Sequence, residues 1–554
     1  MQPREIEAER RSGRAGHVAA KATDCACENR RRAGHSRGRE DGTQRQSGTE
    51  QERPSPAATS GEGGSYKPKA KGGRAGRESE GLIVPRRPGR TDPAEGRGPG
   101  FVASATGGKC EGMAARPNNP EDKARQLQRG LFMAAKRSRG RRFHALYDRI
   151  GRGDVLAEAW RRVKANGGAA GADGESLSAI ERQGVASFLE DVARRLRDGR
   201  YRPQPVRRRY IPKSDGKQRP LGIPTVRDRV VQAATKLVLE PIFEADFRDC
   251  SHGFRPRRGA TGALETLRIH GSRGHRFVVD GDIVQFFDRL DRSKLMDLVK
   301  RRISDRRVLK LVRQWLEAGV MEDGRVRNTL SGTPQGGVIS PLLANIYLHV
   351  LDETWERECR HLGRLVRYAD DFVVLCRGRA QAEEALRRVR EILAGMGLEL
   401  HPDKTRVVEL GLGRDGFVFL GCHLRVMRSH FNGRTYLFRW PSPRAMNRIR
   451  VRIRELTDRR RRAGMKDIRE VVRDLNPVLR GWGNYFRTGN ASLKFQQVDQ
   501  YVNERLVRLM YRGRRDQTRP FANRRWPVAR FANEFGLHRL VGTIRYPGTS
   551  VHAA

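Results

Sequence analysis

Two acidic segments of this chain have the residue types and spacing for chemistry on bound metal ions. The first is Tyr368-Ala369-Asp370-Asp371, which lies between the apolar runs 365–366 and 372–375. Two short apolar runs around a tight acidic turn predict a β-hairpin with paired carboxylates at its tip. Because adjacent carboxylates repel each other, a divalent cation between them is the simplest explanation, and an ordinary Asp-rich turn is the alternative.

The second acidic segment lies upstream, where residues 276–283 read Arg-Phe-Val-Val-Asp-Gly-Asp-Ile and Phe286-Phe287-Asp288 follow. Its β-branched and aromatic residues predict a buried strand that ends in carboxylates. If this strand pairs with the hairpin, Asp282 joins Asp370 and Asp371. Three carboxylates can hold two Mg²⁺ ions about 3.5–4 Å apart, the arrangement by which polymerases carry out in-line phosphoryl displacement.

Several further short motifs follow one another in the middle of the chain. They are Ile-Pro-Lys (211–213) with Gln-Arg-Pro-Leu-Gly-Ile-Pro (218–224), Cys-Ser-His-Gly-Phe-Arg-Pro (250–256), Thr-Pro-Gln-Gly-Gly (333–337), Gly397-Leu398 with Lys404-Thr405, and Gly416-Phe417 with Phe419-Leu420-Gly421. Each motif alone is weak to moderate evidence. Together with the two acidic segments, and in this order, they resemble the reverse transcriptases of group II introns, the intron-encoded maturases.

This resemblance implies an α+β fold of the right-hand polymerase type. It would have fingers, a palm with an antiparallel sheet, and a mainly α-helical thumb and maturase domain. The resemblance also implies that Asp282, Asp370 and Asp371 are the catalytic ligands of two Mg²⁺ ions, with the Ile283 carbonyl assisting.

The same resemblance implies contacts with the incoming deoxynucleotide. The residues concerned are Lys213, Arg219, Phe287, Gln335 and Lys404. Lys213 and Arg219 would hold the triphosphate, Phe287 would exclude a 2′-hydroxyl, Gln335 would contact the nucleotide, and Lys404 would neutralise charge near the carboxylates. Without the family, the cations would be ordinary surface charges, Phe287 a core residue, and residues 334–337 a simple turn.

Residues 435–550 are expected to be mostly helical, and they are basic with interleaved aromatic residues. Residues 475–486, Leu-Asn-Pro-Val-Leu-Arg-Gly-Trp-Gly-Asn-Tyr-Phe, resemble the maturase-specific signature of the same family. We expect Trp482 to pack inward. The arginines expected to bind intron RNA are Arg480, Arg505, Arg508 and Arg512. Arginine together with Trp and Tyr suits structured RNA, which is read by shape, phosphate contacts and stacking.

The composition independently favours a nucleic-acid partner. Lys and Arg number 112 against 64 Asp and Glu, which gives a net charge of +48. Such an excess attracts polyanions over long range and produces salt-dependent binding, although acidic membrane surfaces are an alternative partner.

No apolar run approaches the roughly 18 residues needed to span a bilayer. The seven cysteines form no Cys-x-x-Cys pair, so neither zinc nor a disulfide framework is indicated. We therefore expect a soluble bacterial protein in the cytoplasm, associated with the nucleoid when it acts on DNA.

The chain divides by composition into four expected regions. Residues 1–112 are rich in Gly, Arg, Ser, Glu and Pro and are expected to be disordered. We hypothesise that translation begins at Met113, with a basic RNA-binding arm as the alternative. Residues 113–204 are expected to form an N-terminal extension, 205–425 the fingers and palm, and 435–550 the thumb and maturase domain. No paired Cys and His residues follow about residue 515, so no nuclease module is inferred.

Two helix starts can also be read from the sequence. Ser304 is expected to cap a helix with Val308, Leu311 and Trp315 on one face, and Ser340 to cap the helix that begins with Pro341.

The function expected from these features is RNA-directed DNA polymerisation for a group II intron, with binding of the intron RNA to assist splicing and retromobility. The implied partners are the intron RNA, an RNA template with a DNA primer, and deoxynucleotides. The alternatives are a splicing-only RNA-binding maturase and another bacterial reverse transcriptase of the retron or diversity-generating type.

Overall fold

A four-stranded antiparallel sheet lies at the centre of the described structure. The computed structural model describes residues 120–212, 218–322, 325–327, 336–458, 467–510 and 526–546. The strand order of the sheet is β6-β7-β3-β8. These strands are β3 (Phe277–Gly281), β6 (Arg364–Tyr368), β7 (Asp371–Cys376) and β8 (Arg406–Glu409). The predicted small antiparallel sheet with helices packed against it is confirmed. The N-terminal region expected to be disordered lies outside the described residues.

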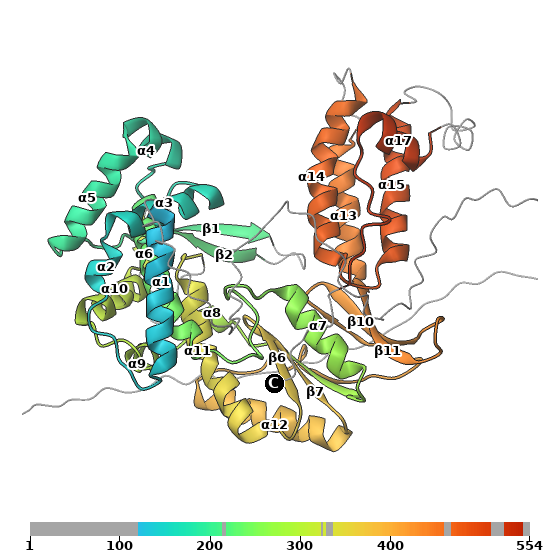
Figure 1. Cartoon of the computed structure of the whole chain (residues 1–554), viewed down its shortest axis with the longest axis horizontal. Coiled ribbons are helices and arrows are strands. Elements are labelled where there is room, and N and C mark those ends of the chain that lie inside the picture. Colours follow the sequence, from blue (N-terminus) through green and yellow to red (C-terminus); the bar gives the residue numbers. More distant parts are fainter. Residues whose placement is uncertain are drawn as a thin grey trace, which may run out of the picture. The chain divides into compact units, whose positions relative to one another are not determined.

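Helices cover both faces of this sheet because its side chains alternate between two apolar cores. Val279, Phe372 and Val374 belong to one hydrophobic cluster, to which α12 (Arg379–Gly395) and α11 (Ser340–Thr354) also contribute. Val278 and Val373, one residue out of phase, belong to a second cluster with α7 (Ala260–Gly271). A strand places successive side chains on opposite faces, so each core receives every second residue. Figure 1 shows α7 and α12 on opposite sides of β6 and β7.

Segments before and after β3 form a helical layer around α6 (Val226–Glu244). Almost every side chain of α6 is buried, including the polar Asp228, Arg229 and Gln232, so other parts of the chain enclose this helix on all sides. Helices α1 and α3 pack against it. The other helices of this part of the chain are α1 (Pro120–Arg137), α2 (Tyr147–Ile150), α3 (Gly153–Asn166), α4 (Leu177–Gln183), α5 (Val185–Arg197), α8 (Phe286–Arg289), α9 (Arg292–Lys300) and α10 (Arg306–Glu317). Helices α3 and α4 are separated by a non-helical segment that contains the glycines of residues 167–174.

A second sheet lies beside this helical layer, with the strand order β2-β1-β4-β5. Its strands are β1 (Val206–Pro212), β2 (Gln218–Ile223), β4 (Val320–Glu322) and β5 (Arg325–Arg327). The hairpin of β1 and β2 contains the motif residues 211–212 and 218–223, so this motif forms a projecting antiparallel pair, as Figure 1 shows.

Among the described residues, the C-terminal part combines a three-stranded sheet with helices around the second core. Its elements are β9 (Phe417–Phe419), β10 (Cys422–Arg428), β11 (Thr435–Pro441), α13 (Pro443–Leu456), α14 (Ile468–Phe486), α15 (Ser492–Met510) and α17 (Val528–Phe535). Strand β11 pairs with β10 along its whole length. The expected boundary between residues 425 and 435 falls within this hairpin, and it stays a prediction.

Each of the two predicted helix caps is wrong by one residue. Asp305, and not Ser304, caps α10, because its carboxylate accepts the backbone N–H groups of Arg307 and Val308. Ser340 is the first helical residue of α11, and the preceding Ile339 occupies the cap position without a side-chain bond. A short π-helical turn, η1 (Trp355–Cys359), extends α11.

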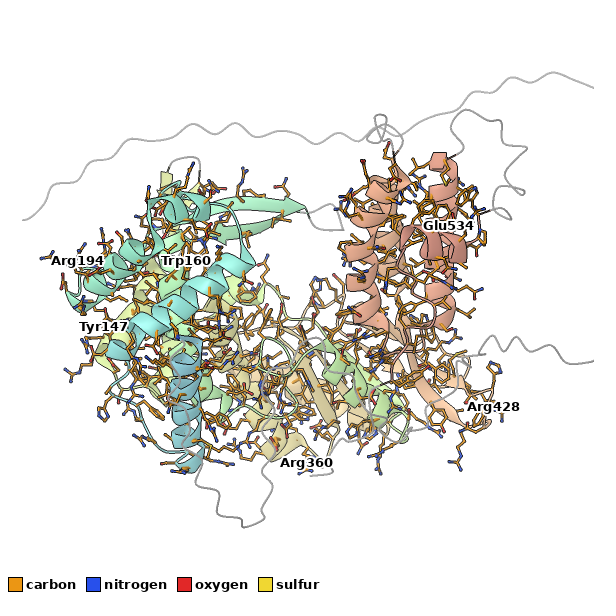
Figure 2. The ribbon with its side chains drawn as sticks, turned by 45° about the horizontal axis from the view of Figure 1, so that its top comes forward. Tyr147, Trp160, Arg194, Arg360, Arg428 and Glu534 are labelled. Atoms are coloured by element: carbon orange, nitrogen blue, oxygen red, sulfur yellow. The ribbon has the colours of Figure 1, made fainter. Side chains whose placement is uncertain are left out.

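Basic side chains are spread over all parts of the described chain. Arg194, Arg360 and Arg428 come from widely separated segments, and each is exposed and projects from the ribbon in Figure 2, whereas Trp160 is buried. In the part of the chain that the structure describes, no helix combines the length and apolar character needed to cross a bilayer.

Candidate active site

The paired aspartates lie at the tip of a tight hairpin, as predicted. Strands β6 and β7 pair antiparallel up to Tyr368 and Asp371, so that Ala369 and Asp370 form a two-residue turn. Ala369 has a backbone φ of 57°, in the left-handed region. That conformation costs a residue with a Cβ roughly 1–2 kcal/mol, so the surrounding structure must stabilise the turn.

Strand β3 brings Asp282 to the same place. It pairs antiparallel with β7, with Gly281 opposite Phe372, and continuing this register by one residue places Asp282 opposite Asp371. The backbone is held beyond the end of β3, because His401 N–H donates to the Asp282 carbonyl at 2.8 Å and Val284 N–H donates to the Glu399 carbonyl at 2.9 Å. The prediction that the upstream acidic strand lies beside the hairpin is confirmed.

The three carboxylates influence one another electrostatically. The pKa of Asp371 is raised to about 6, first by loss of hydration and then by the negative charges of Asp370 and Asp282. Asp280 lies on the same face of β3 as Asp282, and its pKa is raised, mainly by burial. Arg406 on β8 lies 3.4 Å from the Asp280 carboxylate. The arrangement thus brings several negative charges together, and a bound cation would reduce the repulsion between them.

One cation of the chain already approaches this charge. The Lys404 Nζ atom donates to Asp282 Oδ2 at 2.8 Å. Lys404 is thus placed next to the carboxylates, as its predicted role in charge neutralisation requires. Within the described residues, no three His, Cys, Asp or Glu side chains are grouped as a ready-made metal site. The donors themselves are hard carboxylate oxygens, which are the ligands that Mg²⁺ prefers.

The motif at 250–256 supports the hairpin from behind. His252 N–H donates to the Arg367 carbonyl at 2.8 Å, and Ser251 forms an isolated bridge with Arg367. Gly253 packs so closely that an added Cβ would lie 2.4 Å from the Ala369 nitrogen. Only glycine fits there, which explains the residue type at this motif position.

The residues predicted to contact the nucleotide are only partly described. Phe287 is half-buried on α8, and its ring meets that of Phe286 edge-on with the centroids 5.1 Å apart. The backbone of Arg219 lies in β2, opposite Ile211, while Lys213 and Gln335 lie outside the described residues. Gly336, next to Gln335, does contact β2, because an added Cβ would lie 2.3 Å from the Gly222 carbonyl oxygen. The end of the 333–337 motif therefore lies against the hairpin of β1 and β2.

The arginines predicted to bind RNA have different environments. Arg480 is exposed on α14, and Arg508 is half-buried on α15, while Arg512 lies outside the described residues. Arg505 donates from Nε to Thr457 Oγ1 at 2.9 Å and from Nη2 to the Thr457 carbonyl at 3.0 Å. Its guanidinium thus satisfies the C-terminal end of α13, and its contact with RNA stays a prediction.

The aromatic residues of the 475–486 segment include core residues. Trp482 packs against Phe486 and Phe495, with ring centroids 4.9 and 5.6 Å away, which confirms its predicted inward packing. Tyr485 on the same helix is exposed, and its hydroxyl donates to the Leu420 carbonyl at 2.9 Å.

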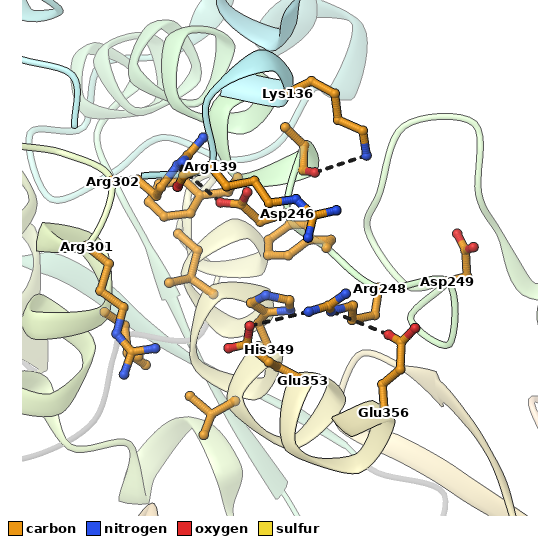
Figure 3. Close-up of a pocket in the computed structure, with 16 residues that line it drawn as sticks. Lys136, Arg139, Asp246, Arg248, Asp249, Arg301, Arg302, His349, Glu353 and Glu356 are labelled. Carbon is orange, nitrogen blue, oxygen red and sulfur yellow. Dashed lines mark hydrogen bonds and ion pairs between the residues drawn. The ribbon is translucent and has the colours of Figure 1, made fainter. Parts of the chain in front are cut away.

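A cavity of about 370 Å³ lies elsewhere, between the end of α1, residues 243–249, α9 and α11. Several of its charged side chains pair with each other: Arg248 lies 3.4 Å from both Glu353 and Glu356, and Arg302 lies 3.2 Å from Asp246. Figure 3 shows these pairs across the cavity. Because its charges are compensated, this cavity does not resemble a polyanion site, and it contains none of the predicted site residues.

Comparison with known proteins agrees with this geometry. Residues 211–424 match the family described as reverse transcriptase (RNA-dependent DNA polymerase), and residues 446–528 match the group II intron, maturase-specific domain. The chain is 36% identical over 361 residues to Protein YkfC of Escherichia coli (strain K12), covering 58% of this chain and 93% of that protein. This chain belongs to the group II intron reverse transcriptase and maturase family.

Two further relatives cover smaller shares of their own length. This reverse transcriptase is 42% identical over 216 residues to the group II intron-encoded protein LtrA of Lactococcus lactis subsp. cremoris, covering 38% of this chain and 35% of LtrA. It is 29% identical over 408 residues to an uncharacterized 91 kDa protein in the cob intron of Schizosaccharomyces pombe, covering 60% of this chain and 49% of that protein. The match thus spans about a third of LtrA and about half of the cob intron protein.

Proposed function

We propose that this reverse transcriptase copies RNA into DNA by two-metal nucleotidyl transfer and binds a group II intron RNA to assist its splicing and mobility. One observation supports the proposal above all. The pairing of β3 with β7 brings Asp282 to the hairpin that presents Asp370 and Asp371, although the two segments are far apart in the sequence.

The residues that would hold two Mg²⁺ ions are Asp282, Asp370 and Asp371, with the Ile283 carbonyl assisting. When bound, the Mg²⁺ ions would neutralise the negative charge that develops on the attacking and leaving oxygens. The raised pKa of Asp371 supports this assignment, because part of it reflects repulsion between the carboxylates that a divalent cation would relieve. The carbonyl of Ile283 is not used in the two backbone bonds that hold this segment, which employ the groups of Asp282 and Val284.

The chain's other residues would then position the substrates. Lys404 would exchange its contact with Asp282 for the phosphates of the nucleotide, which carry a similar negative charge. Phe287 would occupy the space beside the sugar. Lys213, Arg219 and Gln335 would hold the nucleotide from the side of the β1–β2 hairpin. The contact of Gly336 with β2 supports this grouping.

Binding of intron RNA is assigned to the thumb and maturase domain, with Arg480, Arg508 and Arg512 as phosphate contacts. The family match over residues 446–528 supports this assignment, since α14 and α15 lie in that range. The same match weighs against the retron and diversity-generating alternatives, which are not expected to carry the maturase signature. Arg505 is left out because its guanidinium caps α13.

The test is primer extension on an RNA template by the full chain with Mg²⁺ and deoxynucleotides. The variant is Asp370→Asn combined with Asp371→Asn, and the matched control is Asp297→Asn, which removes an exposed aspartate paired with Lys300 on α9. We expect the wild type and the control to extend the primer, and the double variant to lose at least about a hundredfold in rate. RNA binding should persist in all three.

Two other outcomes have clear meanings. If the double variant extends as well as the wild type, the assignment of these carboxylates is wrong. If none of the proteins extends while all bind structured intron RNA tightly, the splicing-only maturase replaces the polymerase.

A further inference from the structure

A fully buried ion pair lies directly beneath the catalytic hairpin. Arg367 is on β6, two residues before the turn, and Asp352 is on α11; both side chains are 0% exposed. Arg367 Nε donates to Asp352 Oδ1 at 2.7 Å, and its Nη2 donates to the other carboxylate oxygen. Burial lowers the pKa of Arg367, but the Asp352 carboxylate outweighs this effect and raises it overall, so the guanidinium stays charged.

The remaining nitrogen of this guanidinium reaches the turn itself. Arg367 Nη1 donates to the Ala369 carbonyl at 2.9 Å and to Asn345 Oδ1 at 3.1 Å. Asn345 in turn donates from Nδ2 to the Gly253 carbonyl at 2.8 Å, which connects α11 to the segment behind the hairpin. A single guanidinium thus connects α11, through Asp352 and Asn345, with the carbonyl of the residue before Asp370.

The turn needs such support for two reasons. Ala369 has a left-handed backbone with φ 57°, which is unfavourable for a residue with a Cβ. Asp370 and Asp371 also repel each other and Asp282, which favours their separation. A planar guanidinium offers several donors in a fixed geometry, which the single flexible ammonium of lysine cannot reproduce.

We propose that Arg367, held by Asp352 and Asn345, is a positioning residue that fixes the Ala369-Asp370 turn, so that the carboxylates are in place before metal or nucleotide binds. This inference rests on the proposed function, since it assigns the hairpin to catalysis. It adds a role for a side chain that touches no substrate and acts through the backbone carbonyl next to Asp370.

The variant for the test is Arg367→Met combined with Asp352→Leu. Replacing only one partner would leave an uncompensated buried charge and would endanger folding, whereas replacing both with apolar residues of similar volume is often tolerated. Arg439→Met combined with Glu265→Leu is the matched control. That pair is also buried, with side-chain exposures of 2% and 8%, and Arg439 donates to the Thr488 carbonyl in the C-terminal part of the chain.

Two measurements do not depend on polymerase activity. Amide hydrogen exchange of residues 366–373 without metal should be about tenfold faster in the Arg367 double variant, and Mn²⁺ binding followed by electron paramagnetic resonance should weaken about tenfold. In extension assays the same variant should need about tenfold more Mg²⁺ for half-maximal rate, while its affinity for the template and primer stays unchanged. The control double variant should match the wild type in all of these after correction for the folded fraction.

Wild-type exchange and Mn²⁺ affinity in the Arg367 double variant would overturn the proposal. Equal changes in the Arg439 control would also overturn it, because they would indicate general loosening of the fold. If the wild type fails to extend primers but the hairpin still exchanges faster in the Arg367 variant, the positioning role stands and the proposed polymerase function fails.

Discussion

Phe287 is a residue whose surroundings suit a selective role. Phe287 lies on the short helix α8, five residues after Asp282, and it is only half-buried. Its ring is supported edge-on by the ring of Phe286, which is itself buried. A ring that is held firmly but not enclosed can exclude a substituent from the neighbouring sugar. We expect Phe287→Ala to raise the use of ribonucleotides relative to deoxynucleotides by about tenfold to a hundredfold.

The measurement is the ratio of kcat/KM for ribonucleotide and deoxynucleotide triphosphates in primer extension. Phe287→Tyr is the control, because it keeps the ring and should keep the selectivity. An unchanged ratio in the alanine variant would show that Phe287 is a core residue only.

At the scale of residues, the sequence predicted the carboxylates but not the side chains that hold them. Asp282, Asp370 and Asp371 stand at the ends of apolar runs, so their position at a sheet edge could be anticipated. Arg367 could not, because an arginine between Val366 and Tyr368 is normally read as an exposed residue of an alternating strand. A signal did exist in α11, where Asn345 and Asp352 are seven residues apart on an otherwise apolar helix face and therefore require buried partners.

At the scale of elements, the close packing of the 250–256 segment on the hairpin gives a second prediction. We expect Gly253→Ala to destabilise the fold by about 1–3 kcal/mol, because the new Cβ would lie 2.4 Å from the Ala369 nitrogen. Displacement of the hairpin should also lower the extension rate of the folded molecules.

Thermal unfolding and primer extension would measure the two effects. Gly259→Ala is the matched control, since an added Cβ there meets no atom within 4 Å and the backbone φ is −169°. Normal stability and rate in Gly253→Ala would mean that the hairpin is not fixed by this contact.

Two arginines, Arg480 on α14 and Arg505 on α15, give a third prediction. Arg480→Gln should weaken binding of intron RNA and reduce the salt dependence of that binding by about one phosphate contact, without loss of stability. Arg505→Gln should instead lower the free energy of unfolding by about 1–2 kcal/mol, since Arg505 caps α13 through Thr457, and should leave the salt dependence unchanged. Titrations at several salt concentrations with thermal melts would separate the roles, and the reverse pattern would contradict them.

The errors made in predicting elements have a physical origin. Asp305 and Ser304 are adjacent and both are good caps. Long-range contacts decide between them, because Asp305 Oδ2 also accepts the backbone N–H groups of Leu146 and Tyr147. Strand β11 was missed because residues 435–441 gain their partner only from β10, and the pairing between neighbouring strands is a property of the tertiary fold. Helix α12 can be read from the sequence alone, because its apolar residues repeat at helical spacing over many turns.

At the scale of the whole molecule, the fold class followed from the ordered motifs and the family that they resemble. The sheet beneath the carboxylates shares its two faces between two apolar cores, one with the helices before it and the other with α7 and the C-terminal helices. The second core takes residues from both sides of residue 430, such as Val373 and Phe495, so the expected boundary there separates segments that share one core. A change in composition along the sequence marks a change in the chemistry of a segment. A hydrophobic core is instead defined by contacts between segments.

The net charge of +48 leads to the last prediction, which concerns the whole surface. Binding of intron RNA should weaken steeply with salt, because each neutralised phosphate releases counterions; six to ten contacts would cost about 10³–10⁵ in affinity between 50 and 200 mM salt. Filter binding by the full chain at several KCl concentrations would measure the slope. An unstructured RNA of equal length should show a similar slope at weaker affinity, since this attraction does not depend on sequence. A nearly flat slope would mean that the basic surface lies away from the RNA and that shape and stacking alone carry recognition.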